Sequence, residues 1–250
     1  MPSGLIIVTG GSRGIGAAIC RRLAADGYAI GVNYAADARA AQATVASIEQ
    51  SGGRAQAFKA DVADPAALHG LFEKATGALG PLAGLVNNAG STGRAVRVEE
   101  QDADELAKLF TINVIATILA CKEAVLRLST KHGGHGGSIV NISSIAARLG
   151  GLPGLGPYAA TKGAVESFTK GLANEVGPEG IRVNAVAPGM TATDMSQPLL
   201  AQAGARERIE AMTPLRRIGA PEEIAEAVAW LISPAARFVT GSVVTVSGGR

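Results

Sequence analysis

The chain has 250 residues, of which 47% are hydrophobic and 18% are charged. This balance is typical of a globular protein with a large core and excludes an intrinsically disordered chain. The formal net charge of +2 is too small to indicate nucleic acid or an anionic membrane as a partner.

Strand-like and helix-like patterns alternate from the start of the chain. Residues 5–9 form a short apolar run that two glycines close, which is typical of a strand buried on both faces. Apolar residues recur every four positions after Gly14, which predicts a helix that ends at Gly27. Similar patterns predict strands at residues 28–34, 54–60, 82–86, 137–142, 181–187 and 242–246, and helices at residues 38–50, 65–78, 102–128, 158–176 and 221–232.

Seven strands that alternate with helices predict an α/β fold, because parallel neighbouring strands need long crossover connections and both sheet faces must be covered. We expect a single domain over residues 1–250, a doubly wound Rossmann fold with a seven-stranded parallel sheet and helices on both faces. Residues 190–218 break the rhythm with prolines and short helical patterns. We interpret them as a substrate lid or lobe inserted into this domain.

A glycine-rich turn joins the first predicted strand to the first predicted helix, where a dinucleotide fold binds pyrophosphate. Its spacing is G-x-x-x-G-x-G rather than the usual G-x-G-x-x-G. Glycines let the backbone turn tightly, and free amides at the start of the helix face negative charge. We therefore predict nucleotide binding by a loop that contains Gly10, Ser12, Arg13, Gly14, Ile15 and Gly16.

The end of the second predicted strand indicates which nucleotide binds. An acid there usually holds a free ribose 2′-hydroxyl, whereas a 2′-phosphate favours Arg or Lys. The first acid after this strand is Asp37, while Arg13 is placed to reach a 2′-phosphate and Arg39 could assist. NADP(H) is therefore predicted in preference to NAD(H). The expected cofactor contacts at this strand end are Asn33, Tyr34 and Ala35.

The candidate catalytic residues lie around the predicted helix at residues 158–176. Tyr158 and Lys162 are four positions apart, so both side chains lie on one face of a helix. A nearby ammonium favours the phenolate over the phenol, whose pKa is otherwise about 10. Ser144, which follows a predicted strand, could supply a second hydroxyl. Tyr and Lys at this spacing are usually only surface neighbours. The catalytic interpretation of the pair therefore depends on the other motifs of the chain.

Several separate segments make the whole chain resemble the short-chain dehydrogenase/reductase superfamily, in that family's order and approximate spacing. These segments are residues 9–16, 61–62 and 87–90, Asn113, Ser144, residues 158–162, Pro188, Gly189 and Thr193. The resemblance implies a Rossmann fold, a nicotinamide cofactor and reversible hydride transfer to a carbonyl or from a secondary alcohol, mainly in the reductase direction.

The resemblance also implies cofactor contacts outside the glycine loop. Asp61 and Val62 would contact the adenine, since an acid can accept a hydrogen bond from the exocyclic amine. A structural cap on the following turn is an equal alternative for Asp61. The other implied contacts are Asn88, Ala89 and Gly90 near the adenosine ribose, and Pro188, Gly189, Thr191 and Thr193 near the nicotinamide.

Four residues would carry the reaction that the resemblance implies. Ser144 and Tyr158 would donate hydrogen bonds to the carbonyl oxygen, and Tyr158 would then supply the proton as general acid. Lys162 would lower the pKa of the Tyr158 phenol, and both residues would also bind the cofactor. Asn113 would support a water that links Lys162 to solvent. Ser143 is the alternative to Ser144, because the gap of fourteen positions (158 − 144) exceeds that of many relatives by one.

Other functions are weighed against this one. A sugar or polyol dehydrogenase that uses NAD(P)+ is an open alternative, as is a reductase of carrier-bound acyl thioesters. A non-catalytic NADP(H)-binding sensor is disfavoured, because such a protein would not need the acid Tyr158. His132 and His135 lie in a glycine-rich segment without neighbouring Cys or acid, so no metal site is predicted.

The remaining expectations concern assembly and location. The resemblance implies a homotetramer, or a homodimer, formed by the two long helices after the fourth and fifth strands and by the C-terminal segment. Val165, Phe168 and Leu172 could form an apolar interface stripe, with burial in the core as the alternative. Cys20 and Cys121 predict no disulfide framework. We expect no signal peptide and no uninterrupted apolar run of membrane-spanning length, and hence a cytoplasmic location.

Overall fold

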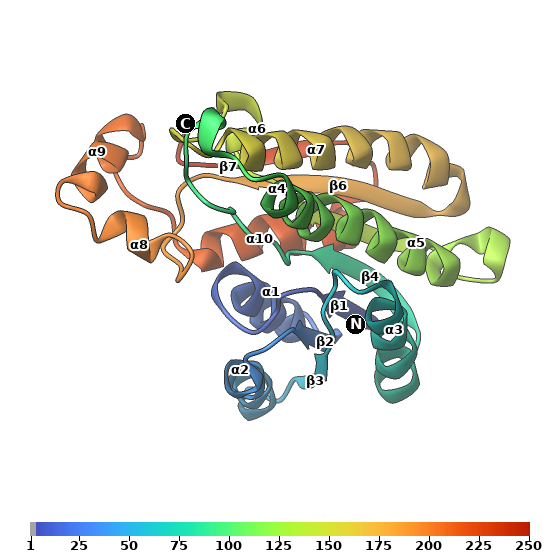
Figure 1. Ribbon diagram of the computed structural model, residues 1–250. Helices are drawn as coiled ribbons and strands as arrows, with labels where there is room; N and C mark the ends of the chain where they lie inside the picture. The colour runs from blue at the N-terminus through green and yellow to red at the C-terminus, as the bar shows by residue number, and fades with distance from the viewer. Residues whose placement is uncertain (1–3) are drawn as a thin grey trace.

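The computed structural model describes residues 4–250. Its seven strands form one parallel sheet in the order β3-β2-β1-β4-β5-β6-β7. This arrangement confirms the predicted doubly wound α/β Rossmann fold (Figure 1). The strands are β1 (Leu5–Val8), β2 (Ala29–Tyr34), β3 (Arg54–Lys59), β4 (Leu82–Asn87), β5 (Gly137–Ile142), β6 (Ile181–Pro188) and β7 (Val243–Val246).

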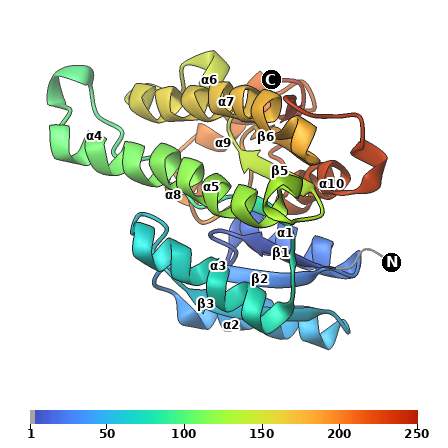
Figure 2. The same ribbon diagram turned by 90° about the vertical axis from the view of Figure 1, so that its right-hand side faces the viewer.

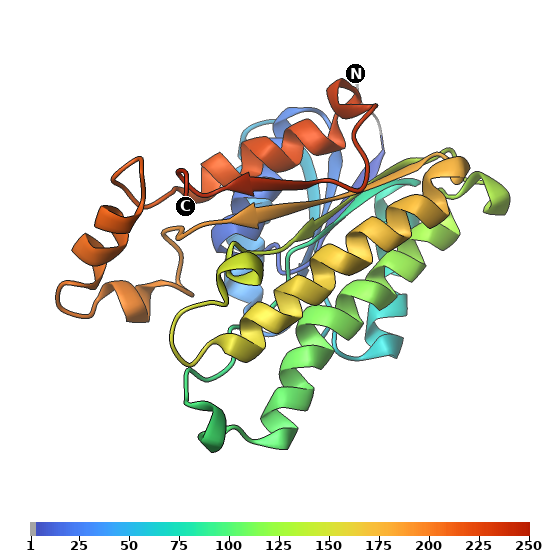
Figure 3. The same ribbon diagram turned by 90° about the horizontal axis from the view of Figure 1, so that it is seen from above.

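Helices cover both faces of the sheet, as predicted. One apolar core joins the sheet to α1, α2 and α10, and a second joins it to α3, α5 and α7. Figure 2 and Figure 3 show these layers from two further directions, with α5 and α7 side by side on one face. The helices are α1 (Gly14–Ala25), α2 (Ala38–Gln50), α3 (Pro65–Leu79), α4 (Ala103–Phe110), α5 (Ala116–Leu128), α6 (Ala146–Leu149), α7 (Gly156–Val176), α8 (Gln197–Leu200), α9 (Ala205–Met212) and α10 (Pro221–Ile232).

The long helix predicted at residues 102–128 is interrupted. A π-helical turn, Thr111–Ile115, separates α4 from α5. Asn113 lies in this turn with no exposed surface, and its side chain binds the backbone of a neighbouring loop. A buried amide must find partners, and wider turns of this kind often occur at functional sites.

Residues 190–218 project from the carboxyl edge of the sheet as a small lobe that contains α8 and α9 (Figure 3). The two ends of the lobe are joined by a bridge between Thr191 and Gly219. Gly219 N also donates to Met190 O at 3.0 Å, and Ala192 N donates to Gly219 O at 2.9 Å. The interpretation of this lobe as a substrate lid within a single domain remains a prediction.

One helical segment among residues 4–250, Ala103–Leu128, is long and apolar enough by composition to cross a membrane, with a mean hydropathy of 1.8. Charged and polar residues such as Asn113 and Lys122 interrupt this segment, so it does not contradict the expectation that no uninterrupted apolar run has this length. Core helices pass the same test, and α5 packs against β4, β5, α3 and α7. The segment is thus weak evidence for a membrane.

The α7 residues proposed as an interface stripe lie mostly in the core. Val165 is 2% exposed and Leu172 is 8% exposed, while Phe168 is half-buried and packs against the same core. For these residues, burial within the chain explains the apolar pattern.

Candidate active site

The predicted site residues gather at the carboxyl ends of the parallel strands. The glycine loop follows β1, the segment of Asn88 follows β4, Ser144 follows β5, and Gly189 follows β6. The sheet order reverses between β1 and β4, and ligands of open α/β sheets bind at such a switch point. The lobe of α8 and α9 stands at this same edge (Figure 1).

The glycine loop is shaped to admit a phosphate. Gly10 and Gly14 have positive φ angles of 61° and 54°, and a Cβ on Gly16 would lie 2.3 Å from Gly10 O. No side chain among residues 4–250 caps the amides of the first turn of α1. Free amides at a helix start attract anions, so this loop fits the pyrophosphate of a dinucleotide.

The loop after β4 is joined directly to the loop after β1. Asn88 Nδ2 donates to Thr9 O at 3.1 Å and to Gly10 O at 3.0 Å. Thr9 Oγ1 accepts hydrogen bonds from Asn88 N at 3.0 Å and Ala89 N at 3.1 Å. These contacts fix the relative positions of two predicted cofactor-binding segments.

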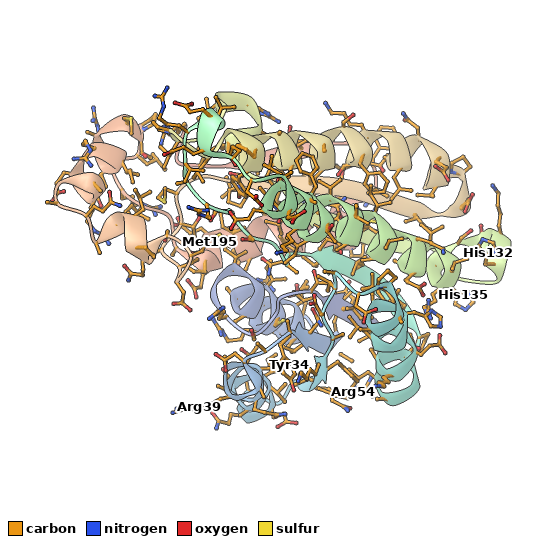
Figure 4. All side chains as sticks on the ribbon, viewed as in Figure 1. Tyr34, Arg39, Arg54, His132, His135 and Met195 are labelled. Atoms are coloured by element: carbon orange, nitrogen blue, oxygen red, sulfur yellow. The ribbon has the colours of Figure 1, made fainter. Side chains whose placement is uncertain are left out.

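At the end of β2, Asn33 is directed into the protein. Its Oδ1 accepts from Gly10 N at 3.2 Å, and its Nδ2 donates to Ala60 O at 2.9 Å. The side chain therefore holds the glycine loop, whereas Tyr34 is half-buried and Ala35 is exposed. Figure 4 marks Tyr34 near this strand end. A direct contact of these residues with the cofactor remains a prediction.

The charged residues near this strand end differ in their surroundings. Arg13 is exposed, and its Nη1 lies 3.9 Å from Asp194 Oδ2 in the lobe. Arg39 is exposed near the start of α2. The carboxylate of Asp37 caps α2 by accepting a hydrogen bond from Ala40 N at 2.9 Å. The first acid after β2 thus has a structural role.

Asp61 caps the turn that follows it, which is one of the two roles predicted for this residue. Its Oδ1 accepts a hydrogen bond from Ala63 N at 2.9 Å, and the neighbouring Val62 is buried. Contact of these two residues with an adenine remains a prediction.

Ser144, Tyr158 and Lys162 are brought together where β5 meets α7. Lys162 is 6% exposed, and its Nζ donates to Ile142 O at 2.8 Å. This Nζ lies 5.8 Å from the centroid of the Tyr158 ring. Ser143, the alternative hydroxyl, is buried and donates to Glu166 Oε1 and Lys162 O instead. Ser144 is therefore the hydroxyl beside Tyr158.

Burial dominates the electrostatics of this group. It raises the pKa of the Tyr158 phenol, and a hydrogen bond with Ser144 partly lowers that pKa again. Burial also lowers the pKa of Lys162 from 10.5 to about 8. The Lys162 ammonium is directed to the carbonyl of Ile142, and its predicted lowering of the Tyr158 pKa remains a prediction.

Asn113 joins the loop after β4 to α7. Its Oδ1 accepts from Ser91 N at 2.9 Å, and its Nδ2 donates to Ser91 O at 2.8 Å and to Thr161 Oγ1 at 3.0 Å. Thr161, which sequence reasoning missed, is buried and donates to Tyr158 O at 2.7 Å. The role of Asn113 in supporting a water remains a prediction.

The residues predicted near the nicotinamide lie at the end of β6 and at the base of the lobe. A Cβ on Gly189 would lie 2.7 Å from Ser247 Cα, so close backbone packing requires glycine here. Thr191 is buried, and Thr193 N donates to Ser196 Oγ at 3.0 Å. A Cβ on Gly14 would lie 3.4 Å from Thr193 Cγ2, which places Thr193 beside the glycine loop.

A cavity of about 360 Å³ adjoins Tyr158. Its wall is formed by the loop after β4, by α4 and by the start of α7, and no residue of the lobe at 190–218 lines it. Sequence reasoning missed most of these residues, since only tertiary packing brings them together. The lining residues are Asp61, Ala63, Ser91, Thr92, Gly93, Arg94, Gln101, Glu105, Leu106, Lys108, Leu109, Ile112, Gly154, Pro157 and Tyr158.

The histidine pair lies away from this site. Figure 4 shows His132 and His135 at the far end of the molecule from Met195 of the lobe. Within residues 4–250, no group of three His, Cys, Asp or Glu side chains could hold a metal ion.

The doubly wound sheet, the glycine loop after β1 and the group of Ser144, Tyr158 and Lys162 at the same edge are together typical of dinucleotide-binding oxidoreductases. The family model described as enoyl-(acyl carrier protein) reductase matches residues 10–250. The oxidoreductase YgfF of Escherichia coli, described as uncharacterized, is 42% identical over 246 residues, which cover 98% of this chain and 99% of YgfF.

Two further relatives extend this comparison. A 3-oxoacyl-[acyl-carrier-protein] reductase of Synechocystis is 40% identical over 97% of this chain and 95% of that protein. The crystal structure of a short chain dehydrogenase from Burkholderia cenocepacia in complex with NADP has a TM-score of 0.89 and 38% identity, over 99% of this chain and 97% of that one. The chain belongs to the short-chain dehydrogenase/reductase family of oxidoreductases, whose members bind a nicotinamide cofactor.

Proposed function

We propose that this protein is an NADP(H)-dependent reductase of carbonyl compounds that also oxidises the corresponding secondary alcohols, with Tyr158 as general acid and base. One observation supports this most directly: Ser144, Tyr158 and a buried Lys162 meet at the switch-point edge of the sheet, next to a loop that fits pyrophosphate. A nearly buried ammonium beside a half-buried phenol is typical of a functional site.

The reduction follows from the positions of these side chains. The nicotinamide, when bound, supplies the hydride. Ser144 and Tyr158 donate hydrogen bonds to the carbonyl oxygen, so negative charge that develops on that oxygen is stabilised. The Tyr158 hydroxyl then gives its proton to the oxygen, and in the oxidative direction the same group takes the proton back. Lys162 holds the nicotinamide ribose and keeps a positive charge near the phenolate.

NADP(H) is the proposed cofactor, with NAD(H) as the weaker alternative. The absence of a free acid at the end of β2 supports it, because Asp37 caps α2. Arg13 and Arg39 are exposed and available to a 2′-phosphate. The related Burkholderia cenocepacia enzyme was crystallised with NADP, which points in the same direction.

The substrate is proposed to be a small carbonyl compound or secondary alcohol. An acyl thioester on a carrier protein is one candidate, supported by the name of the Synechocystis relative. A sugar or polyol is the second, since polar and apolar groups both line the cavity beside Tyr158. A non-catalytic NADP(H)-binding sensor is the least favoured hypothesis. A protein that only binds the nucleotide would not need Ser144, Tyr158 and Lys162 together.

A substrate panel tests this proposal. Loss of absorbance at the reduced nicotinamide band would be followed with NADPH and with NADH over acetoacetyl thioesters, sugars, quinones and simple ketones. We expect turnover of at least one carbonyl class with NADPH. Tight NADPH binding without turnover of any member of a broad panel would favour the sensor.

We also propose a homotetramer or homodimer in the cytoplasm. Apolar side chains are exposed on two faces, with Phe110, Ile115 and Ile118 on the α4 and α5 side and Trp230 and Phe238 near α10. Phe238 is fully exposed, as an aromatic side chain that contacts a second subunit would be in the separated chain. Light scattering of the purified protein would measure the mass, and a monomer at micromolar concentration would contradict this assembly.

A further inference from the structure

The carboxylate of Glu166 links the two segments that carry the catalytic hydroxyls. Its Oε1 accepts a hydrogen bond from Ser143 Oγ at 3.1 Å, and its Oε2 lies 3.6 Å from Arg148 Nε. Ser143 and Arg148 flank Ser144 in the chain, whereas Glu166 lies on α7 with Tyr158. One side chain therefore holds both sides of the Ser144 turn against the tyrosine-bearing helix.

Glu166 is buried, so its carboxylate needs partners within the protein. The residue is 9% exposed, and burying a carboxylate is costly unless it is paired and hydrogen-bonded. Both of its oxygens have partners, and Arg148 is itself anchored because its Nη1 donates to Thr245 Oγ1 on β7 at 3.2 Å. The carboxylate is thus a fixed connection and not a solvated surface charge.

The Glu166 contact belongs to a row of polar contacts between α7 and the end of β5. Lys162 Nζ donates to Ile142 O at 2.8 Å, and Thr169 Oγ1 accepts from Asn141 Nδ2 at 2.9 Å. Positions 162, 166 and 169 lie on one helix face. They contact three consecutive residues, 141–143, directly before Ser144. Polar contacts therefore fix the position of this strand end against α7.

Ser144 has little freedom within its own turn. Its Oγ accepts a hydrogen bond from Ala146 N at 3.1 Å, and its carbonyl accepts one from Ala147 N at 3.0 Å. Ile145 N donates to Pro188 O at 3.0 Å. Any movement of the segment that Glu166 holds would therefore carry the Ser144 hydroxyl with it, relative to Tyr158.

We propose that Glu166 is a positioning residue that sets the separation of the Ser144 and Tyr158 hydroxyls without contacting the substrate. The inference deepens the proposed function and rests on it for the catalytic consequence. The geometry itself is a property of the free protein and can be measured without turnover. If Glu166 is shortened, Ser143 and Arg148 are released, and the hydrogen bond that lowers the pKa of Tyr158 is weakened.

Turnover of the wild-type protein and its variants is the first measurement. For Glu166→Ala we expect kcat to fall about tenfold or more, with the Kd for NADPH changed by less than about twofold. Glu166→Gln keeps an acceptor for Ser143 and should lose less. Ser143→Ala should add little to Glu166→Ala, because both changes break the hydrogen bond between Ser143 and Glu166. Glu175→Ala, exposed on the same helix, is the control and should behave as wild type.

The second measurement does not need a substrate. The protein has three tyrosines, so 3-fluorotyrosine labelling gives three fluorine resonances, and Tyr158→Phe identifies the one of interest. Glu166→Ala should raise the pH at which the Tyr158 resonance titrates and leave those of Tyr28 and Tyr34 unchanged. A purely structural role would not produce this selective shift.

The outcomes separate this inference from the proposed function. A selective shift of Tyr158 in a protein that turns over no carbonyl would support the positioning role and contradict the proposed reaction. An unchanged titration of Tyr158 in Glu166→Ala would overturn the positioning role. If Glu166→Ala does not fold, an unchanged titration in both Glu166→Gln and Ser143→Ala would overturn it. Additive losses of kcat from Ser143→Ala and Glu166→Ala would overturn it as well.

Discussion

Replacing Lys162 with Met should stabilise the protein at neutral pH while it abolishes turnover. Burial lowers the pKa of this lysine from 10.5 to about 8, so the folded state disfavours the charged form by about 3 kcal/mol at pH 7. Met removes that cost but also the charged hydrogen bond to Ile142 O, worth about 2 kcal/mol. The net gain should be about 1 kcal/mol.

The pH dependence distinguishes this cause from a general packing effect. Because the folded pKa lies below the unfolded one, the folded protein binds fewer protons between pH 8 and 10.5, and wild-type stability rises with pH through that window. The advantage of Lys162→Met should therefore shrink as pH increases from 8 to 10.5. Urea unfolding at several pH values measures it, with Lys170→Met on the exposed face of α7 as control. A destabilised variant, or an advantage independent of pH, would refute this account of the buried ammonium.

Three further predictions test the cofactor loop and its support. Arg13→Ala should weaken NADPH binding about tenfold or more and NADH binding less than about twofold, measured by fluorescence titration; an unchanged ratio would remove Arg13 as the phosphate ligand. Gly16→Ala should lower the affinity for both cofactors about tenfold or more, because the added Cβ would lie 2.3 Å from Gly10 O. The control Gly70→Ala adds its Cβ to open space on α3 and should bind both cofactors normally. Asn113→Ala should cost about 3 kcal/mol of unfolding free energy, because its three hydrogen bonds to Ser91 and Thr161 are lost. Equal stability of Asn113→Ala and the exposed Asn174→Ala would contradict that role.

Local patterns predicted the parallel sheet and the order of strands and helices along the chain. Gly10, Gly14 and Gly16 predicted the tight turn between the first strand and the first helix, because the backbone shape of such a loop depends on residues close in sequence. Tyr158 and Lys162 are informative for the same reason, since four positions on a helix fix a shared face. Their proximity to Ser144 was predicted from the family resemblance, because Ser144 follows a strand at about the family's separation from Tyr158.

Features that depend on tertiary packing were not predictable in this way. The π-helical turn at Thr111–Ile115 contains Asn113, which accepts a hydrogen bond from a loop 22 residues earlier in the chain. Asn33 was predicted as a cofactor contact from its place at the end of the second strand. In the structure its side chain holds the glycine loop. The contacts of Glu166 join three elements, and nothing in the pattern of α7 distinguishes it from a surface acid. The lowered Lys162 pKa likewise reflects burial, which a helical spacing cannot reveal.

The role of Tyr158 as general acid is tested most directly by Tyr158→Phe, in which only the phenolic hydroxyl is lost. Carbonyl reduction would be measured in a single turnover with enzyme in excess, and NADPH binding would be titrated on the same preparation. We predict that the rate falls by about three orders of magnitude or more while the Kd for NADPH changes by less than about threefold. A variant that keeps most of its rate, or that loses cofactor affinity as strongly as rate, would contradict this account.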